Sequence, residues 1–279
     1  MEFTDTHCHI QSAGLGGDDN STSGLWSSWP DLTADKVIQN AYEAQVSKMI
    51  CVGCDLADSK LAIDFVKHQP NCYASIGIHP HEAQSNLLLK SLDQFKNLLE
   101  KLLEARPVAA KIVAIGECGL DYFYDYSPKS AQVEILKFQI ELALTYNLPM
   151  IFHVREAFDD FWPILESYPK IRGVLHSFTD SRANLERALG HDLFIGVNGI
   201  ATFTKDSRQL AMYKSIPLQK LLLETDAPYL TPAPHRGTIN QPKFVRRVAE
   251  FLSELMSEGL DDLAMATSRN AAELFNLGV

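Results

Sequence analysis

The chain has 279 residues, of which 46% are hydrophobic, and its 35 Asp and Glu against 25 Lys and Arg give a formal net charge of −10. This composition is that of a folded globular protein and excludes disordered, fibrous and disulfide-stapled classes. The acidic balance also disfavours a broad nucleic-acid footprint, which would need clusters of Lys and Arg.

The sequence predicts a cytoplasmic protein with no membrane contact. No window of about 18 uncharged apolar residues is present, and the first residues lack a basic stretch followed by an apolar one. Five cysteines are an odd number that fits reduced thiols. Cys51 and Cys54 have no second ligand pair at metal-binding spacing, so we expect them to be packing residues.

Short apolar runs alternate with amphipathic stretches along the whole chain, with no linker between them. The runs predict strands at 3–9, 48–53, 72–78, 112–117, 149–153, 173–176, 193–197 and 221–225. The stretches predict helices near 34–47, 57–68, 90–105, 129–146, 156–167, 181–189, 207–215, 241–257 and 261–276. Mostly apolar strands between helices are typical of a covered parallel sheet. Eight such units predict an α/β fold, a single (β/α)8 TIM barrel spanning residues 1–279.

Residues 11–33 form a predicted loop that is too long for a plain connection. We interpret it as an element at the mouth of the barrel. Trp26 and Trp29 within it could offer faces on which bases stack, or could pack the loop against itself.

Metal-binding residue types recur at the predicted ends of the strands, where barrel enzymes build their sites. His7 and His9 are two residues apart, so they share one face of the first strand. The others each end or follow an apolar run: Glu117, His153, His176 and Asp226. If the sheet closes, these six residues suffice for two divalent metals about 3.5 to 4 Å apart, with Glu117 as the bridge. The sequence therefore predicts a binuclear hydrolase site in which Asp226 accepts the proton of the attacking water.

The identity of the metal stays open at this stage. Histidine-rich coordination favours Zn²⁺, while mixed imidazole and carboxylate sites also accept Mn²⁺, and many nucleases use Mg²⁺.

Several longer motifs resemble those of the TatD family of metal-dependent deoxyribonucleases, and the resemblance covers nearly the full chain. The motifs are Thr4-Asp5-Thr6-His7-Cys8-His9, Gly77-Ile78-His79-Pro80-His81, Gly116-Glu117-Cys118-Gly119-Leu120-Asp121-Tyr122, His153-Val154-Arg155, His176-Ser177-Phe178, Glu224-Thr225-Asp226-Ala227-Pro228-Tyr229-Leu230, and Arg236-Gly237 with Asn240 and Pro242. The loop at 11–33 is longer than the family pattern.

The resemblance implies a (β/α)8 barrel that removes nucleotides from DNA ends, in the 3′-to-5′ direction on single strands. It implies a metal and catalytic set of His7, His9, Glu117, His153, His176 and Asp226, with Glu117 and Asp226 closest to the chemistry. His79, Arg155 and Arg236 are our candidates for binding phosphate oxygens, for which the planar fork of arginine is suited.

Two alternatives remain open from the sequence. The same metal site could hydrolyse a small amide, ester or aminoacyl bond, because related barrels exchange substrates through their loops. The chain could also be a non-catalytic binding barrel. For the nuclease, the negative charge predicts weak, non-specific engagement of DNA ends by a monomer.

Overall fold

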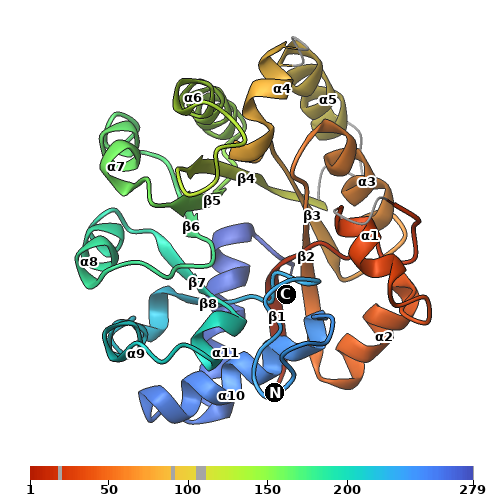
Figure 1. Cartoon of the computed structure of the whole chain (residues 1–279), viewed down its shortest axis with the longest axis vertical. Coiled ribbons are helices and arrows are strands. Elements are labelled where there is room, and N and C mark those ends of the chain that lie inside the picture. Colours follow the sequence, from red (N-terminus) through yellow and green to blue (C-terminus); the bar gives the residue numbers. More distant parts are fainter. Residues whose placement is uncertain (18–20, 89–91, 105–110, 279) are drawn as a thin grey trace. The chain divides into compact units, whose positions relative to one another are not determined.

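The computed structural model describes residues 1–17, 21–88, 92–104 and 111–278 (Figure 1). Eight strands in this part of the chain are hydrogen-bonded in sequence order, from first to last. Each strand pair with a resolved register is parallel. The strands are β1 (Phe3–Cys8), β2 (Val46–Val52), β3 (Cys72–Ile76), β4 (Ile112–Asp121), β5 (Met150–Arg155), β6 (Gly173–Leu175), β7 (Phe194–Val197) and β8 (Leu221–Leu223).

Helices separate the strands, as the alternation of the sequence predicts. They are α1 (Thr22–Ser27), α2 (Ala34–Glu43), α3 (Leu56–Val66), α4 (Ala83–Leu88), α5 (Leu92–Glu104), α6 (Lys129–Tyr146), α7 (Phe158–Glu166), α8 (Arg182–Gly190), α9 (Ser207–Lys214), α10 (Val245–Met256) and α11 (Leu260–Phe275). Short 3-10 turns add η1 (Pro80–Glu82), η3 (Gly199–Thr202), η4 (Leu218–Lys220) and η5 (Pro242–Phe244). Among the described helices, none is both long and apolar enough to cross a bilayer.

The chain divides into two compact units. The first unit comprises Met1–Cys51 and Ser177–Val279, and the second comprises Val52–His176. In the second unit α6 packs on β4 and α7 on β5 (Figure 1). All ten residues of β4 are buried. Strands buried on both faces need nearly continuous apolar sequence, which is the pattern that predicted them.

One glycine sets how closely β4 and β5 approach. Gly119 has a φ of +152°, and a Cβ atom there would lie 1.8 Å from the carbonyl oxygen of His153. Any side chain at this position would therefore push the two strands apart at His153.

The strand ends differ from prediction at two places that matter for the site. The run Gly116 to Gly119 looks like the end of a strand, yet β4 continues to Asp121 and keeps its pairing with β5 through an irregular register between Ile115 and Cys118. Glu117 therefore lies within its strand. The last strand ends early, at Leu223, so Asp226 lies three residues beyond it.

The predicted loop at 11–33 contains helix α1, whose N-cap Ser21 accepts a hydrogen bond from the amide of Gly24. Trp26 is fully buried and cannot offer a face for stacking, whereas Trp29 is 42% exposed. Residues 18–20 of this loop lie outside the described residues, as do residues 90, 91 and 105 of the helix predicted at 90–105.

Candidate metal centre

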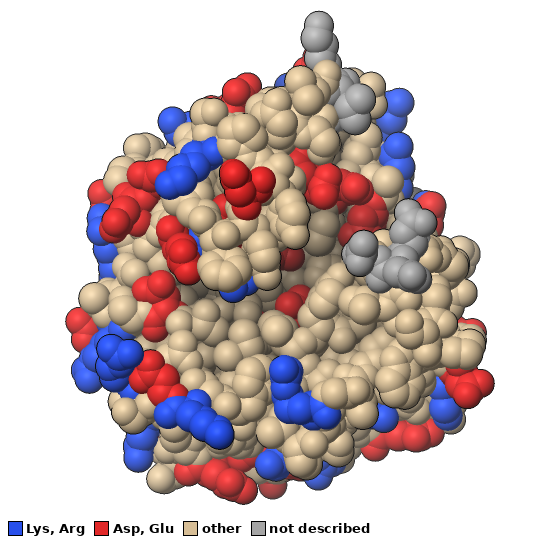
Figure 2. All heavy atoms as spheres, in the orientation of Figure 1, with Lys and Arg blue, Asp and Glu red and all other residues tan. Residues whose placement is uncertain are grey.

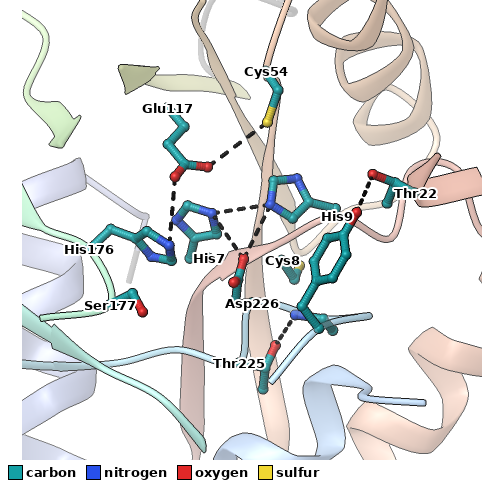
Figure 3. A network of polar contacts seen from close by, with 12 residues as sticks. His7, Cys8, His9, Thr22, Cys54, Glu117, His176, Ser177, Thr225 and Asp226 are labelled. Carbon is teal, nitrogen blue, oxygen red and sulfur yellow. Dashed lines mark hydrogen bonds and ion pairs between the residues drawn. The ribbon is translucent and has the colours of Figure 1, made fainter. Parts of the chain in front are cut away.

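Three side chains of the first unit, which we call the β1–β8 group, turn their ligand atoms toward one another (Figure 3). The Nε2 atoms of His7 and His9 lie 3.2 Å apart. Asp226 Oδ1 lies 3.6 Å from Nε2 of His7 and 3.4 Å from Nε2 of His9. Two imidazoles and one carboxylate converging in this way are the ligand types and geometry that bind a divalent cation.

Backbone hydrogen bonds position this group. The amide of Asp226 donates to the carbonyl of His7 at 2.8 Å, and the amide of His9 donates to the carbonyl of Ala227 at 2.7 Å. The segment after β8 therefore continues to pair with β1. Asp226 has a φ of 60°, a left-handed conformation that aspartate tolerates better than most residues.

Asp5 supports the group from beneath and was assigned no role by the sequence analysis. Its Oδ1 accepts hydrogen bonds from the amides of Thr225 and His7, at 2.9 and 3.3 Å, and its Oδ2 accepts one from the hydroxyl of Thr225, at 2.6 Å. Burial raises the pKa of Asp5 to about 8, although these hydrogen bonds act in the opposite direction. The sequence did place this carboxylate inside an apolar strand, and a buried carboxylate needs hydrogen-bond partners, so a supporting role for Asp5 could have been predicted.

The loop at 11–33 anchors His9. The indole Nε1–H of Trp26 donates to the carbonyl of His9 at 3.0 Å. The ring of Tyr229 packs edge-on against the His9 ring, with centroids 6.3 Å apart, and the Tyr229 hydroxyl lies 3.0 Å from the hydroxyl of Thr22. The inserted loop thus fixes the orientation of a candidate ligand.

In the second unit, His153 of β5 bridges two carboxylates of β4, and we call these three residues the β4–β5 group. His153 Nδ1 lies 2.8 Å from Glu117 Oε1, and its Nε2 lies 2.9 Å from Asp121 Oδ2. Burial disfavours the charged imidazole, but the hydrogen bonds to Asp121 and Glu117 outweigh it and raise the pKa of His153 to about 9. Burial likewise opposes ionisation of Asp121, yet hydrogen bonds from His153 and His81 hold its pKa well below the usual range.

Three further histidines surround this group. His79 Nε2 and His176 Nε2 lie 3.5 and 3.7 Å from Glu117 Oε1, and His81 Nε2 lies 3.0 Å from Asp121 Oδ2. His79 Nδ1 accepts the amide of His81, which turns Nε2 toward Glu117. Burial lowers the pKa of His79 to about 4, so this ring is neutral near pH 7. The ligand atoms of His79, Glu117 and His153 all lie within 4.8 Å of one another, which also fits a divalent cation.

The structure brings together most of the predicted site residues. Within the first unit it collects His7, His9 and Asp226, and within the second it collects Glu117, His153, His176 and His79. The two arginines have other contacts.

The predicted phosphate-binding arginines pack on aromatic rings. The Arg155 guanidinium lies 3.8 Å from the centroid of Phe123. Arg236 donates to the carbonyl of Thr231 at 3.2 Å and lies 4.0 Å from the centroid of Phe203.

Three residues in or near the β4–β5 group were not predicted as site residues. Asp121 and His81 stood in the quoted motifs, but Asp121 was hidden by the prediction that β4 ends at 117. Cys54, expected to be packing, is half-buried and its thiol contacts Glu117 Oε2 at 3.9 Å (Figure 3).

Comparisons with known proteins identify the family to which the chain belongs. The family model for TatD related DNase matches residues 4–276. The uncharacterized metal-dependent hydrolase YabD of Bacillus subtilis is 35% identical over 249 residues, covering 88% of this chain and 94% of that protein. The 3′-5′ ssDNA/RNA exonuclease TatD of Erwinia tasmaniensis is 36% identical over 251 residues, covering 87% and 93%.

A solved structure agrees in fold as well as sequence. The crystal structure of YjjV, a TatD homolog from Escherichia coli K12, superposes with a TM-score of 0.82 at 33% identity, covering 99% of this chain and 98% of that one. The match over both lengths, together with the eight strands paired in chain order, confirms the predicted (β/α)8 barrel class. The chain therefore belongs to the TatD related DNase family of metal-dependent hydrolases.

Proposed function

We propose that this chain is a divalent-metal-dependent deoxyribonuclease that removes nucleotides from single-stranded DNA in the 3′-to-5′ direction. The convergence of His7 Nε2, His9 Nε2 and Asp226 Oδ1 within 3.2 to 3.6 Å carries the proposal. Support for the substrate comes from the family and from a relative named as a 3′-5′ ssDNA/RNA exonuclease.

We further propose that His7, His9, Glu117, His153, His176 and Asp226 are the residues that would hold two divalent ions. The argument rests on the fold class, because the carboxyl ends of all strands of a (β/α)8 barrel open on one mouth. Bound there, Zn²⁺, Mn²⁺ or Mg²⁺ would supply Lewis-acid activation of water and neutralise the charge of the phosphate.

The chain's own residues supply the remaining steps. The carboxylate of Asp226, held by backbone hydrogen bonds on β1, accepts the proton of the attacking water. His79 is neutral near pH 7 and its Nδ1 already accepts a hydrogen bond, so its Nε2 carries the proton and faces Glu117 Oε1 at 3.5 Å. In this proposal that Nε2–H donates to a phosphate oxygen bound beside Glu117. Arg155 and Arg236 bind phosphate oxygens in this proposal, as planar donors suited to that contact.

The negative charge of the chain shapes how DNA is engaged. Acidic and basic side chains are interspersed on the face of the molecule shown in Figure 2. Only a few cationic groups would meet phosphates, so we expect weak and salt-sensitive binding of strand ends. A cytoplasmic monomer remains our expectation for this enzyme.

The test is a metal series on a single-stranded oligonucleotide labelled at its 5′ end, with product lengths resolved. We expect a ladder that shortens from the 3′ end with Mg²⁺, Mn²⁺ or Zn²⁺ and that EDTA abolishes. Asp226→Asn should lower kcat by about 100-fold or more, the size of a general-base contribution. Asp261→Asn, an exposed carboxylate at the start of α11, should leave the rate unchanged.

Two outcomes would overturn the proposal. Turnover of amides or esters without cleavage of any oligonucleotide would favour a small-molecule hydrolase. A protein that binds none of the three metals and cleaves nothing would favour a non-catalytic barrel.

A further inference from the structure

Three exposed aromatic residues follow β4 in the loop that leads to α6, and we call Phe123, Tyr124 and Tyr126 the aromatic platform. Their exposed fractions are 50%, 39% and 66%. The rings of Tyr124 and Tyr126 stack on each other, with centroids 5.4 Å apart and planes inclined by 21°. Neighbouring exposed rings on a folded protein are unusual and mark surfaces that bind something.

The loop is held firmly despite its exposure. Asp121 Oδ1 accepts the amides of Phe123 and Tyr124, each at 3.0 Å. Gln132 of α6 donates from its side chain to the carbonyls of Asp121 and Ser127, at 3.0 and 2.9 Å. Rings whose backbone is fixed in advance lose little conformational entropy when a ligand stacks on them.

The platform is continuous with the β4–β5 group. The ring of His81 packs edge-on against Tyr124 and Tyr126, with centroid distances of 5.4 and 4.8 Å. His81 Nε2 also lies 3.0 Å from Asp121 Oδ2, the same oxygen that contacts His153. A ligand on the platform would therefore lie next to His81, one contact away from Asp121 and His153 of this group.

The charges around the rings are mixed. The Arg155 guanidinium lies 3.8 Å from the centroid of Phe123 and 5.0 Å from that of Tyr124. Asp125, in the same loop, carries the opposite charge. The platform thus offers exposed aromatic faces for stacking beside Arg155, which is proposed above to bind a phosphate oxygen.

We propose that the outer face of Tyr126 stacks on an unpaired base next to the phosphate that is cleaved, which deepens and rests on the proposed nuclease function. A base cannot lie between Tyr124 and Tyr126, because two stacking intervals need roughly 6.8 Å and their centroids are 5.4 Å apart. The occupant is a single-stranded nucleic acid, because bases inside a duplex have both faces covered. Stacking is tolerant of sequence, which fits an enzyme that degrades any strand end.

The test combines abasic substrates with ring variants. Three oligonucleotides each carry one abasic residue, at the last, second or third position from the 3′ end, and are compared with the intact strand. For the wild-type protein we expect one of these positions to raise KM by about 5- to 100-fold, the range of base–aromatic stacking. The kcat value should change little, because stacking acts equally on bound substrate and transition state.

Variants of Tyr126 test whether its ring causes the rise in KM on the abasic strand. Tyr126→Ala should raise KM for the intact strand by a similar factor and remove the discrimination against the abasic residue, while Tyr126→Phe should keep both at wild-type values. Tyr168→Ala, a half-buried tyrosine in the turn entering β6, is the matched control and should behave as wild type. The Tyr126→Ala effect should persist at high salt, unlike a phosphate contact.

Different results would overturn the proposed base stacking and the proposed nuclease function. The stacking proposal is overturned if the wild-type protein cleaves all four strands with equal KM, or if Tyr126→Ala still shows a raised KM for the abasic strand. Either result leaves the proposed nuclease function standing. Absence of cleavage of every strand overturns the nuclease and the platform with it. A Tyr126→Ala protein with unchanged KM points to a protein partner for the rings and also overturns the proposal.

Discussion

The β1–β8 group and the β4–β5 group contain the same residue types but are held in different ways. In the first, backbone hydrogen bonds orient His7, His9 and Asp226, whose ligand atoms face one another at 3.2 to 3.6 Å. In the second, His153 is bound directly to Glu117 and Asp121 at 2.8 and 2.9 Å. The longer contacts of the first group leave its ligand atoms facing one another, whereas the second group is closed by short contacts that raise the pKa of His153 to about 9. Metal-ligand identity alone does not say how a site is stabilised.

The largest effect should follow from removing the carboxylate of the β1–β8 group. Asp226→Asn keeps the size of the side chain and its backbone contacts, so we expect metal affinity to fall by at least about 100-fold. Unfolding by urea in EDTA should change by less than about 1 kcal/mol, as for a substitution that leaves packing intact. Titration calorimetry with Mn²⁺ and urea melts measure the two. A large loss of stability without metal would contradict the comparison.

In the β4–β5 group we expect a substitution to lower the stability of the metal-free protein substantially, unlike Asp226→Asn. Asp121→Ala leaves His153 and the amides of Phe123 and Tyr124 without their carboxylate. Breaking a buried ion pair costs about 3 to 5 kcal/mol, so the metal-free protein should lose stability on that scale in urea melts. Asp159→Ala, an exposed carboxylate in the first turn of α7, is the control and should change stability little. Equal stabilities for the two variants would show that the ion pair contributes nothing.

A smaller effect should come from the loop that anchors His9. Trp26→Phe removes the indole donor to the carbonyl of His9 while keeping an aromatic ring in the core. Losing a hydrogen bond that orients a metal-binding residue should lower metal affinity by about 10-fold. Trp162→Phe, at a buried tryptophan of α7, should lower stability without altering metal affinity. If both variants bind metal equally well, the loop does not orient the ligand.

The last expected effect is a pH dependence of the stability of the metal-free protein. The pKa of His153, raised to about 9, means that its contribution to stability is complete below about pH 6.5 and is lost as the pH rises through 9. The lowered pKa of Asp121 works oppositely, since its contribution is present above its usual pKa and is lost as the pH falls toward the lower folded value. Melting temperature in EDTA should therefore fall between pH 6.5 and 9.

Asp5 also contributes to the pH dependence of stability, because its raised pKa of about 8 reduces stability as the pH rises from about 4 to 8. A variant of His153 separates the two contributions. His153→Gln should flatten the upper part of the profile and leave the part due to Asp5. An unchanged profile in this variant would remove His153 as its source.

The sequence predicted the alternation of strands and helices and most candidate ligands, because period and residue type are local properties. It did not predict that β4 runs past Gly116 and Gly119, since pairing with β5 overrides two local breakers. Asp121 was missed for that reason. Asp5 was missed, and for Trp26 packing of the loop was predicted but not its bond to His9, because the partners, Thr225 and the His9 carbonyl, are known only once the chain is folded.

The bridge between Cys8 and Ala227 has a consequence for the order in which the protein is made. The β1–β8 group joins residues from opposite ends of the sequence and cannot assemble until Ala227 has been synthesised. The β4–β5 group and its surrounding histidines lie within one continuous stretch, from His79 to His176. Domains fold from the N-terminus during synthesis, so the stretch with the ion pair is complete first. An unfinished chain on the ribosome that ends before Asp226 therefore lacks the residue proposed to accept the proton of water, which delays the proposed activity until Asp226 has been synthesised.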